Sequence, residues 1–214
     1  MNSFWEERFH DEGRIWGDSP SRTAVYAIDL FKKTGVHEVL IPGSGYGRNA
    51  DAFSRAGFEV TGIEISKTAL SIARQGSPEV RYHYGSVLDM PLDNSVYDAI
   101  YCFNVLHLFR KNDRVEFLER CCDQLKDGGV IFFVVFSDKD SSYGTGKMVE
   151  ENTFESKPGR EVHYYTDDDL VSEFRGFEII TTGMMEDPEE HGKEGKHIHL
   201  LRYIYARKRA IICS

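Results

Sequence analysis

The sequence predicts an α/β fold, a doubly wound and mostly parallel seven-stranded sheet that ends in an antiparallel strand pair. Short apolar runs alternate with amphipathic helical segments between residues 37 and 136, which is typical of β-α units. The run VIFFVVF (130–136) is apolar throughout, as in a strand buried on both faces. Two strand-like runs near the C-terminus have no helical pattern between them, and this favours antiparallel pairing.

Two β-α units open the predicted sheet. We expect strands at 37–42 and 58–64, followed by helices at 47–57 and 66–75. Gly57 marks the end of the first helix, and Ser66 suits the N-cap of the second. Ligands of such sheets bind beyond the carboxyl ends of the strands. The glycine-rich turn that follows the first strand lies at this edge.

The elements that complete the sheet follow in order. Strands are expected at 79–87, 96–104 and 130–136. A helix is expected up to Gly128 and Gly129, from the spacing of Val115, Leu118, Cys121, Cys122 and Leu125. Further on, TDDDL predicts the start of a helix at 166–174, because its hydroxyl and carboxylates suit a helix N-terminus. The antiparallel strands are expected at 176–186 and 196–208, on either side of the polar stretch 187–195.

Composition narrows the classes of function. The net charge of −9 argues against a nucleic-acid partner, whose binding needs clustered Lys and Arg. No run approaches the roughly 18 apolar residues of a membrane span, and the charged N-terminus does not read as a signal peptide. The four cysteines lack paired or CxxC spacing, so neither a disulfide scaffold nor a zinc knuckle is predicted. A reducing cytoplasm is the expected compartment.

The stretch VLIPGSGYG contains three glycines at alternate positions, Gly43, Gly45 and Gly47. Glycine permits positive φ and close approach of a ligand to the backbone. Arg48 stands where a dinucleotide GxGxxG turn needs a small residue. Glu64 ends the second strand, 21 residues after Gly43, where a carboxylate can accept ribose hydroxyls. Without a phosphate-binding motif, the pattern indicates an adenosine-containing ligand that carries no phosphates.

At this point the chain resembles a known family. VLIPGSGYG, GIEIS, GSVLDMPLDNSVYDAIYCFNVLHLF and LKDGGVIFFVV are similar, in order and spacing, to the successive motifs of class I S-adenosylmethionine-dependent methyltransferases. The resemblance implies a Rossmann-like methyltransferase fold, S-adenosyl-L-methionine as cofactor, and direct in-line methyl transfer to a small molecule. The residues that it implies in cofactor binding are Gly43, Ser44, Gly45, Glu64, Ile65, Ser86, Val87, Phe103 and Asn104.

The chain also departs from the family pattern. Ile41 replaces an acidic residue that many members carry, and Ser86 replaces a common aspartate, although Asp89 lies close by in the sequence. LIPGSG and FWEERFHDEGRIWG look more like the thiopurine, thiol and halide branch. The segment GKMVEENTFESKPGREVHYYTDDDL looks more like tellurite-resistance-type methyltransferases. The subfamily, the acceptor atom and the oligomeric state therefore stay open.

The resemblance divides a single domain of residues 1–214 into four parts: a helical cover (1–34), the cofactor-binding core (35–136), an insertion (137–165), and a C-terminal helix with antiparallel strands (166–214). The insertion contains Gly and Pro without a clear period, which indicates a substrate-side segment or a mobile lid. Cover and insertion are long enough to enclose an acceptor. The N-terminal aromatic residues favour a cover that folds over the cofactor, although packing on the outside of the sheet is nearly as compatible.

No catalytic residue is predicted. Trp5, Trp16 and Phe103 are candidates for contact with the sulfonium through their aromatic faces, and a hydrophobic clasp explains Trp5 about as well. His107 is interpreted as structural. His197 and His199 have metal-like HxH spacing, but no carboxylate is expected beside them, so we interpret them as an ordinary strand face and expect no metal.

Two other classes of function remain open. A nicotinamide-dependent oxidoreductase shares the β-α-β core and the acidic residue, but it needs a catalytic pair or a further domain that the sequence does not show. A non-catalytic module that binds S-adenosylmethionine is compatible with Ile41 as a sign of a decayed site. Cofactor binding distinguishes these possibilities.

Overall fold

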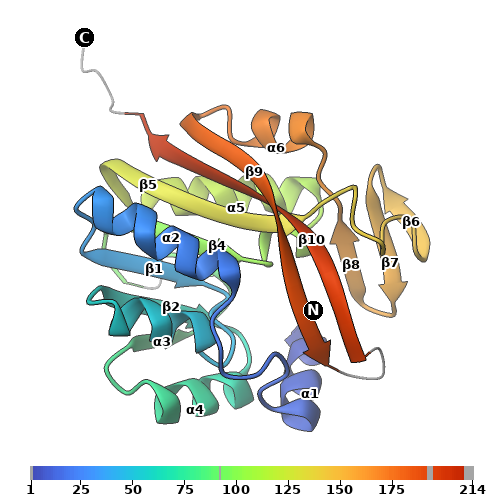
Figure 1. Ribbon diagram of the computed structural model, residues 1–214, viewed down its shortest axis with the longest axis horizontal. Coiled ribbons are helices and arrows are strands. Elements are labelled where there is room, and N and C mark those ends of the chain that lie inside the picture. Colours follow the sequence, from blue (N-terminus) through green and yellow to red (C-terminus); the bar gives the residue numbers. More distant parts are fainter. Residues whose placement is uncertain (1, 92, 192–194, 210–214) are drawn as a thin grey trace.

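The computed structural model describes residues 2–91, 93–191 and 195–209. Over these residues it confirms the predicted fold class, with a seven-stranded sheet in the order β3-β2-β1-β4-β5-β10-β9 (Figure 1). Strands β1 to β5 are parallel, and β10 and β9 join the edge of β5 in antiparallel pairing. The strands are β1 (Glu38–Pro42), β2 (Glu59–Glu64), β3 (Arg81–Tyr84), β4 (Tyr97–Phe103), β5 (Leu125–Phe136), β9 (Phe177–His191) and β10 (Gly195–Lys208).

Helices cover both faces of this sheet. They are α1 (Asn2–Glu12), α2 (Arg22–Lys33), α3 (Arg48–Arg55), α4 (Lys67–Gly76), α5 (Lys111–Asp123) and α6 (Asp167–Glu173), with short 3-10 helices η1 (Val87–Asp89) and η2 (Leu106–Leu108). Ser66 caps α4, and Thr166 forms a capping box at the start of α6, both as predicted. In the described part of the chain, no helix has both the length and the apolar character that a membrane span requires.

The hydrophobic core has two layers because successive side chains of β4 and β5 point to opposite faces. Tyr101 and Phe132 pack with α2, α3 and α4 on one face. Ile100 and Phe133 pack with α5 and α6 on the other face. These side chains are fully buried, and each contributes about 1.5–3 kcal/mol relative to an exposed position. The two layers hold the strand ends rigidly, and the glycine turn lies at one of those ends.

The helix predicted to continue to Gly128 and Gly129 is shorter than expected. It ends at Asp123, and β5 begins at Leu125, which pairs with Tyr97. Val115 is 48% exposed, whereas Arg114 of the same helix is 4% exposed. Arg114 donates to Glu173 at 2.7 Å, so a charged residue occupies a buried position of the helical stripe. The prediction failed because it counted only apolar residues.

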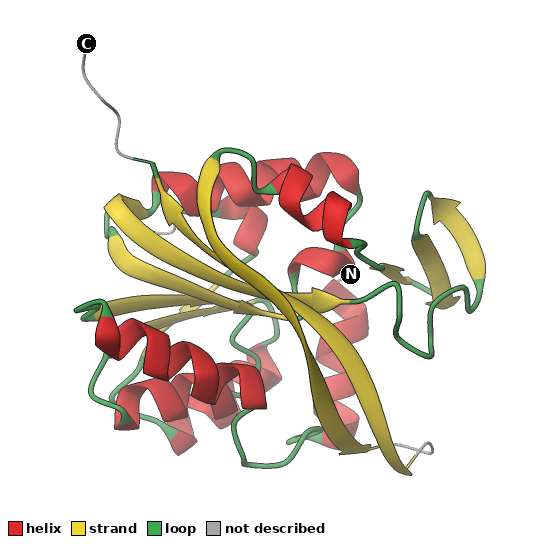
Figure 2. Cartoon of the chain, turned by 45° about the horizontal axis from the view of Figure 1, so that its top comes forward, coloured by secondary structure: helices red, strands yellow, loops and turns green. Residues whose placement is uncertain are grey.

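The predicted insertion contains regular structure that the sequence pattern did not indicate. Strands β6 (Lys147–Glu150), β7 (Thr153–Lys157) and β8 (Arg160–His163) form a separate antiparallel sheet over the described residues. Figure 2 shows this small sheet beside the main one. Each strand has only four or five residues, which is too short for a period of two to stand out from the flanking turns.

The antiparallel pair is longer than predicted. Strand β9 continues to His191 and β10 begins at Gly195, so most of the polar stretch 187–195 is strand and not a loop. Pro188 lies within β9, opposite Ile198. Since β9 is an edge strand of the described sheet, the missing N–H of proline can face outward without loss of a ladder hydrogen bond. The two strands extend beyond the rest of the sheet (Figure 2).

Candidate functional site

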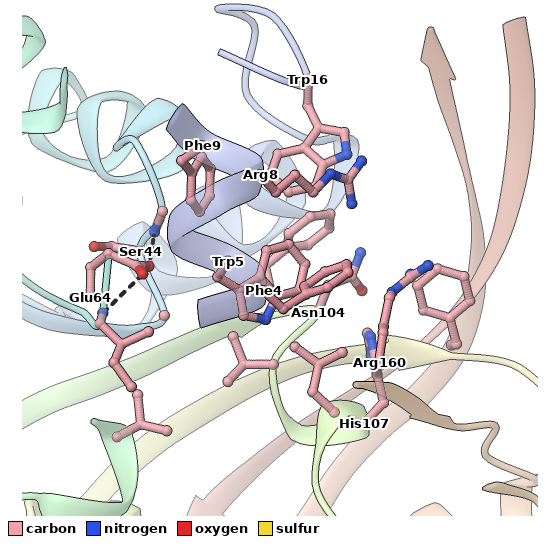
Figure 3. Close-up of a pocket in the computed structure, with 18 of the residues that line it drawn as sticks. Phe4, Trp5, Arg8, Phe9, Trp16, Ser44, Glu64, Asn104, His107 and Arg160 are labelled. Carbon is pink, nitrogen blue, oxygen red and sulfur yellow. Dashed lines mark hydrogen bonds between the residues drawn. The ribbon is translucent and has the colours of Figure 1, made fainter. Parts of the chain in front are cut away.

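A cavity of about 1130 Å³ opens at the carboxyl ends of the parallel strands. Figure 3 shows its wall, which combines the ends of β1, β2 and β4 with α1 and with residues from the second sheet. All nine residues predicted to bind the cofactor line this one cavity. Ile41, Trp5, Trp16 and His107 also line it. The structure therefore brings together segments from near both ends of the chain, from Phe4 to His199.

The glycine turn after β1 requires glycine for two reasons. Gly43, Gly45 and Gly47 all have positive φ, of 67°, 57° and 91°. A Cβ atom on Gly43 would lie 2.3 Å from Cγ2 of Val105, far inside van der Waals contact. The hydroxyl oxygen of Ser44, between the first two glycines, is buried and has no hydrogen-bond partner among the described residues. The turn thus leaves a polar atom for a ligand in the cavity.

Glu64 ends β2 and is 5% exposed. Its Oε2 accepts from the backbone N–H of Gly45 at 2.8 Å, and its Oε1 accepts from those of Ile65 and Ser66 at 2.9 and 2.8 Å. Burial raises the pKa of this carboxyl, and the three N–H donors oppose the rise. A carboxylate has about four acceptor positions, so these contacts leave room on Oε2 for a further donor.

Ser86 and Val87 form the wall beyond β3. The Ser86 hydroxyl caps η1 by accepting from Leu88 N at 3.2 Å. Asp89, which the sequence suggested as a nearby carboxylate, is exposed and lies outside the cavity wall. It points away because η1 turns Val87 and Leu88 inward instead.

Phe103 and Asn104 form the end of β4. Asn104 has a φ of 57°, a conformation that asparagine adopts more readily than most residues. Its backbone N–H donates to Val134 at 3.0 Å, and its buried Oδ1 has no hydrogen-bond partner among the described residues. The Arg48 guanidinium lies 5.5 Å from the Phe103 ring centroid and 5.7 Å from that of Trp16.

The N-terminal segment closes one side of the cavity. Glu6 of α1 accepts from the hydroxyls of Ser66 and Thr68 at 2.6 and 2.7 Å, and these bonds lower the pKa of its carboxyl. Trp16 stacks on Tyr46 with ring centroids 6.1 Å apart. Trp5 packs on Phe9 and Trp16. Helix α1 is therefore anchored on the start of α4, directly beside Glu64.

His107 lies in η2 at the opposite wall and is 1% exposed. Burial, followed by the charge of Arg160, holds its pKa well below its usual range, so the imidazole is neutral. Its ring meets that of Phe136 edge to face at 4.8 Å. Nδ1 is buried with no hydrogen-bond partner in the described part of the chain. The packing agrees with the structural interpretation, but the ring also faces the cavity.

The sequence predicted residues 137–165 as a substrate-side segment or lid, but it named no residue of the far wall and assigned no part of that wall to the antiparallel pair. Arg160 and Tyr164 come from the second sheet and its C-terminal end, and Glu189 and His199 come from the long antiparallel pair. The expectation that no carboxylate lies beside the HxH histidines was wrong. Glu189 is the direct register partner of His197. Extending the two strands symmetrically toward a short turn would have revealed this pairing, but the polar residues and Pro188 were interpreted as a loop.

Comparison with known proteins gives one family match. The methyltransferase domain family model matches residues 40–133. A probable S-adenosylmethionine-dependent methyltransferase of Mycolicibacterium smegmatis is 27% identical over 163 residues, which cover 72% of this chain and 60% of that protein. The ubiquinone biosynthesis O-methyltransferase of Alkalilimnicola ehrlichii is 32% identical over 110 residues, covering 49% and 44%. The chain thus spans less than two thirds of either relative.

A solved structure matches nearly the whole chain. It is the Burkholderia thailandensis 1,6-didemethyltoxoflavin-N1-methyltransferase with bound 1,6-didemethyltoxoflavin and S-adenosylhomocysteine. The TM-score is 0.71 at 22% identity, and the match covers 97% of this chain and 87% of the other. At this identity the likeness establishes the fold alone.

Proposed function

We propose that this chain is a class I S-adenosylmethionine-dependent methyltransferase that transfers a methyl group from S-adenosylmethionine to a small molecule, and the match to the methyltransferase domain family and the similarity to such a methyltransferase support this. The observation that carries the proposal is the cavity. Its volume of about 1130 Å³ exceeds the roughly 300–1,000 Å³ of a site for one drug-sized ligand. Such a cavity has room for a cofactor and an acceptor side by side.

The residues of the glycine turn and the strand ends fit the cofactor. Ser44 Oγ and Asn104 Oδ1 are buried without partners among the described residues, and we assign them to the polar methionine end. The remaining acceptor position on Glu64 suits a ribose hydroxyl. Ser86, Val87 and Leu88 line the part of the wall that we assign to the adenine. Ile65 lies between these groups and supplies an N–H to Glu64.

When bound, the cofactor supplies a methyl group activated by its sulfonium charge. The chain itself has to hold the acceptor in line and keep water out. Phe103, Trp5 and Trp16 line the cavity, and their faces suit a cationic sulfur. Burial lowers the pKa of the His107 imidazole, so it is neutral and a weak base toward a methyl acceptor. We assign it no further role.

The proposal of a small acceptor rests on the volume of the cavity and on the residues of its far wall. The far wall offers Tyr164, Arg160 and His199, which suit a polar or aromatic molecule better than a polymer. The ubiquinone O-methyltransferases and the toxoflavin methyltransferase among the similar proteins are named for small molecules. The net charge of −9 disfavours nucleic acid. Free thiols at Cys102, Cys121 and Cys122 suit a reducing compartment such as the cytoplasm.

Transfer of labelled methyl from S-adenosylmethionine tests this proposal. The full chain is incubated with panels of small thiols, amines, phenols and oxyanions, and product is separated and counted. We expect the wild-type chain to methylate a member of at least one panel. Gly43→Ala should methylate none, because it distorts the glycine turn while the far wall stays unchanged. If the protein binds the cofactor and methylates no member of any panel, the small-acceptor assignment fails. If the protein binds a nicotinamide cofactor and not S-adenosylmethionine, the proposal that it is a methyltransferase fails.

A further inference from the structure

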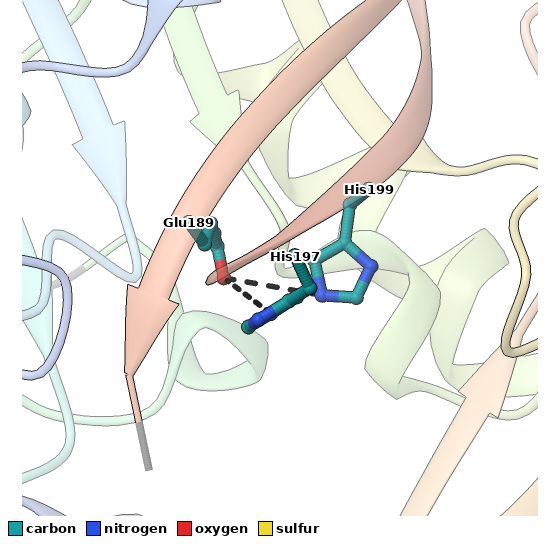
Figure 4. Close-up of side chains that lie close together, drawn as sticks. All are labelled: Glu189, His197 and His199. Carbon is teal, nitrogen blue, oxygen red and sulfur yellow. Dashed lines mark ion pairs between the residues drawn. The ribbon is translucent and has the colours of Figure 1, made fainter. Parts of the chain in front are cut away.

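Three side chains of types that commonly bind metal ions lie on one face of the long antiparallel pair β9 and β10. His197 of β10 lies opposite Glu189 of β9, and His199 lies opposite Asp187. Because strand side chains alternate between faces, His197 and His199 share a face with Glu189. Figure 4 shows the two imidazoles and the carboxylate directed at one another.

The distances between the donor atoms are close to those of a metal centre. Oε2 of Glu189 lies 3.8 Å from Nε2 of His197 and 3.9 Å from Nε2 of His199. The three donor atoms all lie within 4.8 Å of one another. A tetrahedral zinc ion with bonds of about 2.1 Å separates its ligands by roughly 3.4 Å. The two Glu189 contacts are therefore about half an ångström longer than in such a site, and the two imidazole nitrogens, at most 4.8 Å apart, would also have to move toward each other to bind an ion.

Hydrogen bonds fix which nitrogen of each imidazole faces the cluster. Nδ1 of His199 lies 3.1 Å from Oδ2 of Asp140, and Nδ1 of His197 lies 2.9 Å from the carbonyl oxygen of Gly195. A carboxylate and a carbonyl only accept, so Nδ1 carries the proton in both rings. Each Nε2 is then free of its proton in the neutral form and directed toward Glu189. Metal-binding histidines are typically oriented by such acceptors on the opposite nitrogen.

Carboxylates make the close charged contacts of His199. Asp140 lies 3.1 Å and Glu189 3.9 Å from its ring nitrogens. Arg160 acts on His199 in the opposite sense, and Arg48 and Arg22 act on the neighbouring Asp187. Asp187, 5% exposed, adds a further carboxylate beside Glu189 and His199. Its Oδ2 has no hydrogen-bond partner in the described part of the chain. A purely apolar or cation-rich wall would exclude a metal, and this wall is neither.

We propose that Glu189, His197 and His199 bind a divalent transition metal ion, with Asp140 positioning His199. Two imidazoles and one carboxylate suit Zn²⁺ or Fe²⁺ and leave coordination positions open. Glu189 and His199 line the cavity, so the open positions face the space assigned to the acceptor. Metal binding does not depend on the proposed function. Its use, to hold an acceptor through an oxygen or sulfur atom, rests on that function.

The test is a zinc titration of the untagged full chain after treatment with a chelator. We expect one Zn²⁺ per chain, and Glu189→Gln and His197→Ala should each weaken binding by about tenfold or more. Asp140→Asn should weaken it by about 10- to 100-fold without removing a ligand. His83→Ala is the matched control, because His83 pairs with Asp93 at 3.1 Å outside the cluster, and it should leave zinc binding unchanged.

Cobalt provides a second readout that needs no variant. Co²⁺ bound to the wild-type chain should show the visible absorption of a four- or five-coordinate nitrogen and oxygen site, which zinc then displaces. No stoichiometric zinc binding, or binding that is equal in wild type, Glu189→Gln and His197→Ala, would show that the cluster is an ion-pair network only. S-adenosylhomocysteine binding, measured on the same samples, separates this failure from failure of the proposed function.

Discussion

At the scale of single residues, the carboxylate of Glu64 serves both the glycine turn and the proposed ligand. It accepts three backbone N–H groups that shape the turn, and we propose that it also accepts a ribose hydroxyl. Glu64→Gln removes the charge and replaces one acceptor oxygen with a donor. We predict that it weakens S-adenosylhomocysteine binding by about 1.5–3 kcal/mol, the range for hydrogen bonds to a charged group, as measured by calorimetry.

The matched control for this change is Glu59→Gln, at the exposed start of the same strand. It should leave the dissociation constant unchanged. An unaltered constant in a folded Glu64→Gln protein would refute the ribose assignment. If Glu64→Gln fails to fold while Glu59→Gln folds, the main role of Glu64 is to hold the turn through its backbone N–H contacts.

Gly43 and Gly35 allow backbone strain to be separated from steric contact. Their φ values are similar, 67° and 71°, but only at Gly43 would a Cβ atom meet another residue, Val105. Alanine at Gly35 should cost about 1–3 kcal/mol of unfolding free energy through strain. We predict a larger loss for Gly43→Ala, together with loss of cofactor binding. Equal losses in denaturant unfolding would mean that Val105 simply moves aside.

At the scale of elements, α1 is held beside the proposed cofactor site by aromatic packing of Trp5 and Phe9 and by the hydrogen bonds of one side chain. Glu6 joins it to Ser66 and Thr68 at the start of α4. We predict that Glu6→Ala speeds amide hydrogen exchange in α1 and weakens cofactor binding, and that Glu6→Gln, which keeps one acceptor oxygen, partly restores both. Exchange measured with and without S-adenosylhomocysteine also tests the lid. If protection in residues 2–20 and 140–165 is the same in both states, neither segment closes over the ligand.

The elements that could be predicted from sequence are those with long, regular patterns. Strand β5 is apolar over many residues, and the caps of α4 and α6 are local signals that depend on a single side chain each. The second sheet and the outer half of β9 were missed because their residues are polar and their strands are short or contain Pro188. Their stability comes from pairing and from contacts such as Arg114 with Glu173, which join residues far apart in the chain.

At the scale of the whole molecule, stability should depend on pH through His163. Burial lowers the pKa of this histidine to about 4, whereas an unfolded histidine has a pKa near 6.5. The unfolded chain therefore binds more protons between these values, and the native state loses stability as the pH falls from about 6.5 to 4. We predict that His163 accounts for about 2 kcal/mol of the loss between pH 7.5 and 5.

Denaturant unfolding at pH 7.5 and pH 5 measures the loss of unfolding free energy that we attribute to His163. His163→Gln should reduce the loss, and the exposed control His10→Gln should not. An identical pH dependence in wild type and His163→Gln would contradict the assignment.

The two halves of the site differ in how far the sequence could predict them. The half that we propose for the cofactor follows β1, β2, β3 and β4, and motifs at these strand ends named nine residues that all line one cavity. The far half is assembled from β8, β9 and β10, whose positions depend on strand register. A register error of one residue reverses the face of every side chain. No register could be assigned here, because β8 is too short to be recognised and the outer part of β9 was interpreted as a loop. Arg160 was therefore missed, and Glu189 was not paired with His197.

We propose that the cavity at the strand ends binds a methionine nucleoside without phosphates. Calorimetric titration of the purified chain with S-adenosylhomocysteine, S-adenosylmethionine and NAD is the direct test. We expect one saturable site for each of the first two ligands, competition between them, and no heat with NAD. Tight binding of NAD, with no binding of either methionine nucleoside, would contradict it.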